Sequence, residues 1–348
     1  MKKLLALLLT LTLSLGLLAG CGQTEPTAED TPDTQTETDT QNNTGDLRKI
    51  TITEQVRGYH WAPAYLAEEG LTAEFQTIRG SDATAPVLSG DAQFTLKGIE
   101  TALMVNEGGQ GCKVVLSTTQ KYPYQLIGAT EEYSTLESLE GGLLAGGQST
   151  NSGPYSFAQA CINYAGLEGK VEISTMASSG YAAAIANGEL QGAISTNPWS
   201  AKQLTDAGGV VIVDGTDDGV IEDIIGSASY ELFTVITSDA LIESDPELVQ
   251  SAVNAMAKAI QWMQTATPEE IAAQLGTLFD GATEEELLYD AQFDKDHQVA
   301  TTDGYHTDSG FQAAINLTKL AGGITGDPTA DQIFDESFLD KAWENLGQ

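Results

Sequence analysis

The sequence predicts an α/β protein whose folded body has two lobes. Segments rich in β-branched residues alternate with helix-like segments between residues 48 and 117, and the same alternation restarts after residue 136. Regular alternation of this kind is typical of a mostly parallel sheet covered by helices. The body, residues 47–348, is also long enough that its core is expected to divide into two domains.

The first lobe begins with the alternating, β-rich segment 48–53, which we expect to form a strand before the loop 57–63. Glycines at positions 70 and 90 are expected to end the next two helices. The elements expected after the loop are a helix over 64–70, a strand over 73–79, a helix over 82–89, a strand over 93–96, a helix over 99–106 and a strand over 113–117.

The second lobe is expected to start with the apolar strand 143–145, which leads into a polar, glycine-rich loop. Pro154 opens the next helix, because proline suits the first position of a helix. The elements expected from there are helices over 155–165 and 180–187 and strands over 193–196, 210–213 and 231–237. After Asp239 the pattern is mainly helical, with a long amphipathic helix over 246–265 and a shorter one over 268–279.

The first 20 residues have the features of a secretory signal peptide. Lys2 and Lys3 precede an apolar run over 4–18, which is too short for a membrane-spanning helix. The tetrapeptide LAGC that ends at Cys21 resembles the bacterial lipobox, in which the cysteine is acylated and becomes the mature N-terminus. We therefore expect Cys21 to carry lipid such as palmitate and to anchor the protein at the extracytoplasmic face of the cell membrane. The alternative is an ordinary signal peptide with an incidental cysteine.

Residues 21–46 are expected to form a disordered tether behind the anchor. Beyond the cysteine this segment contains no aromatic residue and no Val, Ile, Leu or Met, and it is rich in Thr and acidic residues. Such a segment cannot bury enough apolar surface to offset the entropy lost on ordering. As a flexible coil it would reach about 25–30 Å, which would hold the body just off the membrane.

The charge of the chain excludes one class of partner. The sequence has 50 acidic and 15 basic residues, and loss of Lys2 and Lys3 with the signal takes the formal net charge from −35 to −37. Nucleic-acid binding depends on clustered Lys and Arg, so we expect no nucleic acid as a partner. Solubility at a cell surface is a sufficient reason for this charge.

The remaining cysteines and the histidines give no sign of a metal site. Cys112 and Cys161 are expected in different lobes, so we expect no disulfide between them. The three histidines, His60, His297 and His306, are dispersed, and no CxxC motif is present. The sequence therefore predicts no metal site. It also predicts no cofactor, because the GxGxxG, Walker and GxSxG patterns are absent.

Four stretches of the body together resemble a known family. They are the segments 63–70, 87–93, 139–149 and 183–198, whose last part reads AAIANGELQGA and ends with the dipeptide NP. Their order and spacing are similar to those of the substrate-binding proteins of bacterial ABC importers. Within that group the resemblance is strongest to the nitrate, sulfonate and taurine-binding proteins and to their thiamine-pyrimidine-precursor relatives.

The resemblance implies a periplasmic-binding-protein-like fold of type II, with a hinge and a ligand cleft between the lobes. Two crossing strands would join the lobes near 125–130 and 227–237. The first lobe would then comprise residues 47–127 plus 232–348, and the second residues 128–231. The resemblance also implies a small-molecule ligand, a separate ABC permease with its ATPase as partners, and a monomer.

Candidate ligand-binding residues of the first lobe follow from where ligands bind in open α/β sheets, at the carboxyl ends of strands. Tyr59, His60 and Trp61 come directly after the first strand and offer stacking surface and a ring nitrogen. The alternative is that Tyr59 and Trp61 only pack the lobe. Lys97 precedes a helix and could contact a carboxylate or sulfonate, although a solvated lysine accounts for it equally well.

The second lobe offers a loop of hydroxyl and amide groups before the helix that Pro154 opens, which suits a polar or anionic group. Glycine-rich turns also occur for backbone reasons alone. The candidates from this lobe are Ser149, Thr150, Asn151, Ser152, Asn197 and Trp199. Tyr122 and Tyr124, near the hinge, fit core packing as well as binding.

These features favour a binding protein that does no chemistry. We expect a lipid-anchored, extracytoplasmic component of an ABC importer that captures a small organic molecule of sulfonate, carboxylate or pyrimidine type. One alternative is an enzyme like the pyrimidine synthases of the same fold, although their cysteine-rich cluster is missing here. A second alternative is a surface sensor or interaction lipoprotein that presents the ligand to a receptor.

Overall fold

The computed structural model describes residues 48–67, 71–78 and 83–347. The predictions for the signal peptide, for Cys21 and for the tether concern residues outside these ranges. Within them, no helix is both long enough and apolar enough to cross a membrane.

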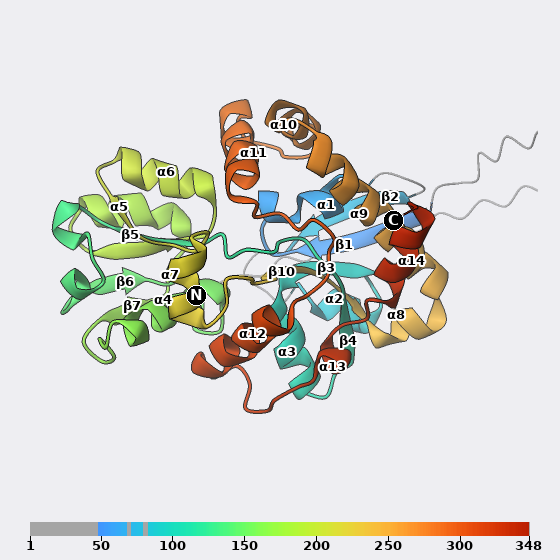
Figure 1. Cartoon of the computed structure of the whole chain (residues 1–348), viewed down its shortest axis with the longest axis horizontal. Coiled ribbons are helices and arrows are strands. Elements are labelled where there is room, and N and C mark those ends of the chain that lie inside the picture. The colour runs from blue at the N-terminus through green and yellow to red at the C-terminus, as the bar shows by residue number, and fades with distance from the viewer. Residues whose placement is uncertain (1–47, 68–70, 79–82, 348) are drawn as a thin grey trace, which may run out of the picture. The chain divides into compact units, whose positions relative to one another are not determined.

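The first lobe is built on a five-stranded sheet with the order β2-β1-β3-β10-β4 (Figure 1). All of its strands run in one direction except β10, which is antiparallel to both neighbours. The strands are β1 (Arg48–Glu54), β2 (Leu71–Thr77), β3 (Phe94–Gly98), β4 (Cys112–Ser117) and β10 (Phe233–Ser238). The helices between them are α1 (Ala62–Tyr65), α2 (Ala85–Ser89) and α3 (Ile99–Glu107), with a 3-10 turn η1 (Tyr59–Trp61) before α1.

The second lobe has its own five-stranded sheet, with the order β7-β6-β8-β5-β9. Here β5 is the strand that runs against the others. The strands are β5 (Gln125–Gly128), β6 (Leu143–Ala145), β7 (Glu172–Ser174), β8 (Gly192–Ser195) and β9 (Val210–Asp214). The helices are α4 (Gly153–Tyr164), α5 (Tyr181–Ala186), α6 (Pro198–Asp206) and α7 (Asp218–Ile225), with 3-10 turns η2 (Glu131–Tyr133), η3 (Glu137–Leu139) and η4 (Ser178–Gly180).

Two connections, 118–124 and 226–232, join the sheets, and each leads into an antiparallel strand. This corrects one boundary, because residues 125–127, which we assigned to the first lobe, pair as part of β5 with β8 and β9. The other domain boundaries stay predictions. The α/β fold class, with two lobes, is confirmed by the two separate sheets.

Aromatic side chains fill the space around these two connections. Tyr122 is completely buried, and its ring packs against Tyr124, Phe157 and Tyr230 at centroid distances of 4.6–5.0 Å. Core packing therefore explains Tyr122 without a ligand. Tyr124 continues the cluster into the first lobe, since its ring lies 6.0 Å from that of Phe233 on β10.

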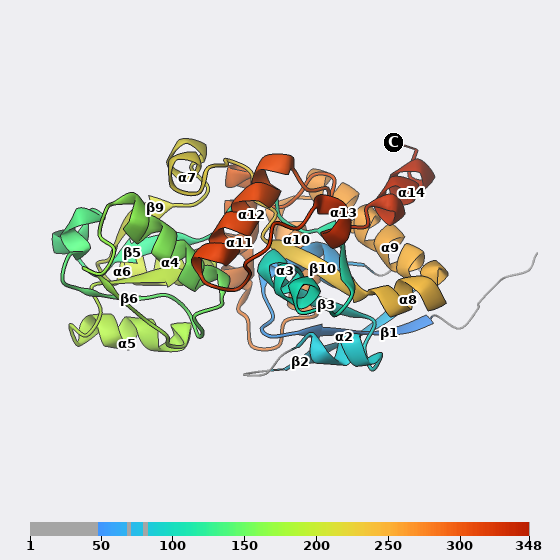
Figure 2. The same ribbon diagram turned by 90° about the horizontal axis from the view of Figure 1, so that it is seen from below.

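The chain after β10 is helical, as its pattern predicts. The long helix predicted over 246–265 is observed with the same bounds, and its N-cap Asp245 accepts the Leu248 N–H. The helices are α8 (Asp239–Ser244), α9 (Pro246–Thr265), α10 (Pro268–Gly276), α11 (Glu284–His297), α12 (Asp308–Leu320), α13 (Ala330–Ile333) and α14 (Ser337–Asn345). Two of them contact both lobes: α12 packs against α3 and α4, as Figure 2 shows, and α11 packs against α10 and α6.

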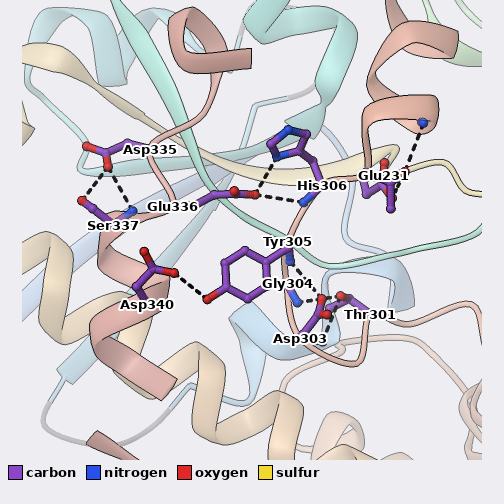
Figure 3. A network of polar contacts seen from close by, with 12 residues as sticks. Glu231, Thr301, Asp303, Gly304, Tyr305, His306, Asp335, Glu336, Ser337 and Asp340 are labelled. Atoms are coloured by element: carbon purple, nitrogen blue, oxygen red, sulfur yellow. Dashed lines mark hydrogen bonds and ion pairs between the residues drawn. The ribbon is translucent and has the colours of Figure 1, made fainter. Parts of the chain in front are cut away.

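A polar network fixes the segment that precedes α12 (Figure 3). His306 lies with its Nδ1 2.7 Å from Oε1 of Glu336, and this partner raises the pKa of the histidine. Tyr305 donates from its hydroxyl to Asp340 at 2.8 Å, and Thr307 donates to Glu231 at 3.1 Å. The network thus ties the approach to α12 both to α14 and to the connection 226–232, which positions the C-terminal helices against both lobes.

Candidate functional site

A pocket lies where the start of α1, helix α11 and the start of α6 come together. The cavity itself is small, about 10 Å³, which is room for about one water molecule, and it lies within a hollow of about 310 Å³ that includes open solvent. Among the described residues, Pro198 at the start of α6 is the one lining residue from the second lobe, and the others come from the first lobe and the connection 118–124. The side chains that matter for its chemistry are Tyr59, His60, Pro198, Asp290, Phe293 and Asp294.

His60 connects the two lobes. Its Nε2 lies 2.6 Å from the carbonyl oxygen of Thr196, which can only accept, so Nε2 carries the proton and Nδ1 does not. The imidazole stacks on Phe233 at a centroid distance of 4.3 Å. Burial lowers the pKa of His60 to about 4. At neutral pH the ring is therefore uncharged, and its one N–H is already donated.

Asp294 is buried, and both of its carboxylate oxygens accept hydrogen bonds. The Tyr59 hydroxyl donates to its Oδ2 at 3.2 Å, and the Ala300 N–H donates to its Oδ1. Burial raises the pKa of Asp294 to about 6 and also raises that of Tyr59. The pair fixes the turn η1 against α11, and through it the position of His60.

Asp290, one helical turn earlier, accepts a hydrogen bond through only one of its carboxylate oxygens in the described ranges. Its Oδ1 accepts the backbone N–H of Trp199 at 2.9 Å, in the first turn of α6, where a carboxylate is favoured by the helix dipole. In the described part of the chain, Oδ2 has no hydrogen-bond donor. The residue is 6% exposed, and burial raises its pKa to about 7. Asp290 thus lines the pocket with one acceptor oxygen that has no donor among the described residues.

Trp61 and Lys97 do not line this pocket. Trp61 is 5% exposed and packs edge-on against Phe233, and its Nε1 finds no acceptor among the described residues. Lys97 donates from Nζ to Gln55 at 3.0 Å. Their roles in ligand binding stay predictions, and the packing of Trp61 in the first lobe agrees with the structural alternative.

The loop 149–152 is largely exposed, and its polar groups interact within the loop. Ser152 donates from its hydroxyl to the carbonyl of Ser149 at 2.7 Å, and Thr150 donates to Asn151 at 3.1 Å. These four residues are outside the pocket lining. Whether they contact a ligand stays a prediction.

Asn197 and Trp199 flank Pro198 in the sequence but are not among the residues that line the pocket. Asn197 caps α6, because its Oδ1 accepts the Ser200 N–H at 2.7 Å. The half-buried Trp199 ring lies 5.8 Å from that of Tyr289 on α11, and the ammonium group of Lys202 lies 6.0 Å from its centre. Both residues shape the contact between α6 and α11, and direct contact with a ligand stays a prediction.

The two aspartates were not among the residues predicted from the sequence. They belong to the acid-rich segment of α11, which reads as a solvated helix. A signal is nevertheless present, since Leu287, Asp290, Ala291 and Asp294 recur at the spacing of one helical face and all four are buried. Two acids on an apolar face are exceptional and could have been singled out.

Another buried carboxyl group, that of Glu100, lies close to the start of α4. Glu100 is in the first turn of α3, and its Oε2 is inaccessible and without a partner in the described ranges. Burial raises the pKa of Glu100, while its own backbone N–H, Lys97 and the backbone N–H of Gly153 lower it. The carboxylate therefore faces the start of α4 in the second lobe.

Comparison with protein families gives one match. Residues 61–271, more than half of the chain, match the family model described as NMT1/THI5 like. A comparison with curated proteins found no match.

Solved structures with this architecture include both binding proteins and an enzyme. The ligand-binding component of an ABC-type import system from Staphylococcus aureus, solved with zinc bound, is 16% identical, with a TM-score of 0.66 over 85% of this chain and 99% of that one. The periplasmic aliphatic sulphonate-binding protein SsuA from Escherichia coli is 13% identical, with a TM-score of 0.64 over 84% and 99%. The desulfurization enzyme DSZB is 14% identical, with a TM-score of 0.61 over 86% and 99%.

At these identities the solved structures are evidence for the fold alone, and they confirm the two-lobed architecture. The family assignment rests on the family model, which agrees with the resemblance seen in the sequence. The chain belongs to the NMT1/THI5-like family.

Proposed function

We propose that the protein is the solute-binding component of an ABC importer. It captures a small organic molecule in the pocket between the lobes and delivers it to a separate permease that works with an ATPase. The observation that carries this proposal is the pocket itself, which both lobes line. The similarity to an import component and to a sulphonate-binding protein supports it.

The contacts between the lobes suit reversible closure around a ligand. Apart from bonds made by the two connections, three hydrogen bonds in the described ranges cross between the second lobe and the first: His60 to Thr196, Trp199 to Asp290, and Thr216 to Nδ1 of His297 at 2.9 Å. A hydrogen bond contributes about 0.5–1.5 kcal/mol net, so three contribute on the order of 2–4 kcal/mol. A ligand that contacts both lobes can supply or replace a free energy of this size.

An enzyme of the same fold is the alternative, and DSZB gives it some support. The cysteines of the described ranges offer no reactive thiolate, because both are buried and burial raises the pKa of Cys112 to about 12 and that of Cys161 further. The imidazole N–H of His60 is donated to Thr196. A sensor that presents ligand to a receptor instead of a permease is the other alternative, and it predicts the same pocket.

The proposal is tested by binding without conversion. A thermal-shift screen of the purified protein against pyrimidines, sulfonates, carboxylates and amines should find compounds that raise Tm, because a ligand of the native state stabilises it. Calorimetry should then give one ligand per chain, and the ligand should be recovered unchanged. Recovery of a product instead would favour the enzyme.

The proposed lipid anchor has its own test. Cys21→Ala should move the protein from the membrane fraction to the soluble fraction. A variant that still fractionates with the membrane would contradict the anchor but not the binding function.

A further inference from the structure

The ionisable side chains that line the pocket are mainly acidic. Among the residues of the described ranges that line it, Asp290 and Asp294 carry carboxyl groups, and no Lys or Arg is present. His60 cannot supply positive charge near neutral pH, because burial lowers its pKa to about 4. Lys97, the predicted partner of an anion, is hydrogen-bonded to Gln55 and lies outside the lining. An anionic ligand would meet no cation here.

One of the two carboxylates has an oxygen without a hydrogen-bond donor in the described ranges. Both oxygens of Asp294 accept hydrogen bonds, from Tyr59 and from Ala300. Asp290 accepts only one, through Oδ1, although it is 6% exposed and lines the pocket. A buried carboxylate without its full set of donors is costly, and a donor that enters the pocket would remove that cost.

The rest of the lining suits an organic cation. Tyr59, His60 and Phe293 contribute aromatic rings, and cations bind favourably at ring faces and beside carboxylates in partly desolvated sites.

We propose that the pocket binds a positively charged organic molecule, such as one with an ammonium or amidinium group, and that Asp290 is its counter-ion. This inference rests on the proposed solute-binding function and concerns the same pocket. It replaces the sulfonate and carboxylate classes expected from the sequence.

The same contact would couple binding to the approach of the lobes. Asp290 joins α11 to the start of α6 through the Trp199 N–H. A cation at Oδ2 keeps the carboxylate ionised, and an ionised acceptor makes the stronger hydrogen bond to Trp199. Ligand binding would therefore strengthen a bond between α11 and the second lobe.

The test compares compounds that share a skeleton and differ in charge. Benzylamine and phenylmethanesulfonate form one such pair, and butylamine and butanesulfonate form another. Calorimetric titration of the purified protein should show binding of the amines and none of the sulfonates. Asp290→Asn should weaken amine binding at least tenfold, which corresponds to about 1.4 kcal/mol.

A matched control lies on the same helix. Glu285→Gln removes one exposed negative charge of α11 outside the pocket, and it should change amine binding less than twofold. Equal losses in Glu285→Gln and Asp290→Asn would show a diffuse electrostatic effect and would overturn the assignment to Asp290.

Proton release provides a second measurement that needs no variant. The groups that face Asp290 are Asp294 and Glu286 on α11, Tyr59 and His60 on the η1 side, and the start of α6, while Lys202 of α6 lies over Tyr289 instead. Because burial raises the pKa of Asp290 to about 7, a bound cation should expel part of a proton near neutral pH. Calorimetry in two buffers of different ionisation enthalpy measures that release, and its absence contradicts the inference.

The outcomes separate the inference from the proposed function. Binding of a sulfonate, undiminished by Asp290→Asn, would overturn the inference and leave the solute-binding function intact. Failure of every amine in the panel at millimolar concentration would also overturn it. Failure of every compound in the thermal-shift screen, the pyrimidines included, would contradict the solute-binding function as well.

Discussion

The second lobe presents two helix starts to the rest of the body, and a different carboxylate faces each of them. At the start of α6, the side chain of Asn197 caps the helix, and Asp290 of α11 accepts the Trp199 N–H. At the start of α4, Ser152 makes no side-chain cap, and the buried Glu100 of α3 faces the Gly153 N–H. Helix starts favour anions, so both places would suit an anionic ligand.

The comparison shows that the chain supplies these anions itself. The two carboxylates differ in access to the oxygen that has no hydrogen-bond donor. Asp290 lines a pocket, whereas Oε2 of Glu100 is inaccessible and unpartnered in the described ranges. The start of α6 is thus arranged to receive a donor from outside. At the start of α4 the carboxyl group is enclosed, and burial raises its pKa.

The largest effect is expected from reversing the charge at the start of α6. Asp290→Lys replaces the counter-ion with a cation and places it against the positive end of the helix. Amine binding should fall by more than about 100-fold, since a buried charge contact of this kind is worth about 2–5 kcal/mol when one side is removed. Calorimetric titration measures the loss, and thermal unfolding checks that the variant is folded. Amine affinity within tenfold of the wild type would show that the two helix starts do not differ as described.

A smaller effect is expected on the stability of the protein. The folded-state pKa of Asp290, about 7, lies above its ordinary value of 3.8, so the folded protein binds the proton more tightly than the unfolded chain does. Stability is therefore lost as pH rises from about 4 to 7. Asp290→Asn should raise Tm over the wild type at pH 8, by about 2–4 °C for each kcal/mol gained, and change it little at pH 4.

Glu100→Gln is the matched variant at the start of α4. Burial also raises the pKa of Glu100, so the gain in Tm at high pH should have the same sign. Its effect on amine binding should be smaller than that of Asp290→Asn, because Glu100 lies outside the pocket lining. Thermal unfolding and calorimetry of both variants across pH 4–8 measure this. A larger loss of amine binding in Glu100→Gln than in Asp290→Asn would indicate that the ligand binds at the start of α4.

His60→Phe tests the hydrogen bond from His60 to Thr196, which joins a pocket-lining residue of the first lobe to the second lobe. The variant keeps a ring against Phe233 but removes the donor to Thr196. One hydrogen bond is worth about 0.5–1.5 kcal/mol, so ligand affinity should fall by about 2–10-fold. Unchanged affinity would indicate that approach of the lobes is not linked to binding.

The smallest effect is expected in the loop before α4. Ser149 is exposed, and only its carbonyl takes part in the contacts of the loop. Ser149→Ala should change Tm by less than one degree and amine affinity by less than twofold, as is usual for surface substitutions. A loss of amine affinity above tenfold would support the prediction from the sequence that residues 149–152 bind the ligand.

Local sequence patterns predicted those helices and strands well that are amphipathic or are bounded by glycine or proline. The long helix α9 has the predicted bounds, and α3 and β4 differ from prediction by one residue. The short edge strand β7 and the helix α6 were missed, since three residues give little periodicity and the start of α6 reads as a break. The position of β5 in the second sheet depends on its partners β8 and β9, which no local pattern specifies.

The site was harder to predict because its chemistry depends on burial. The loop 149–152 has the polar composition of a binding site, but its groups are exposed and interact with one another. Asp290 lies in a segment whose composition indicates solvent, and only its packing against α6 removes it from water. Tyr59 and His60, which the sequence places in the loop after β1, do line the pocket, and their contact with a ligand stays a prediction.

The most direct test of the central claim is a crystal structure of the protein with the amine that binds most tightly. The account predicts the ligand nitrogen at about 2.7–2.9 Å from Oδ2 of Asp290, with the Trp199 N–H still donating to Oδ1. A ligand whose charged group lies at the start of α4, with Oδ2 of Asp290 left without a donor, would contradict it.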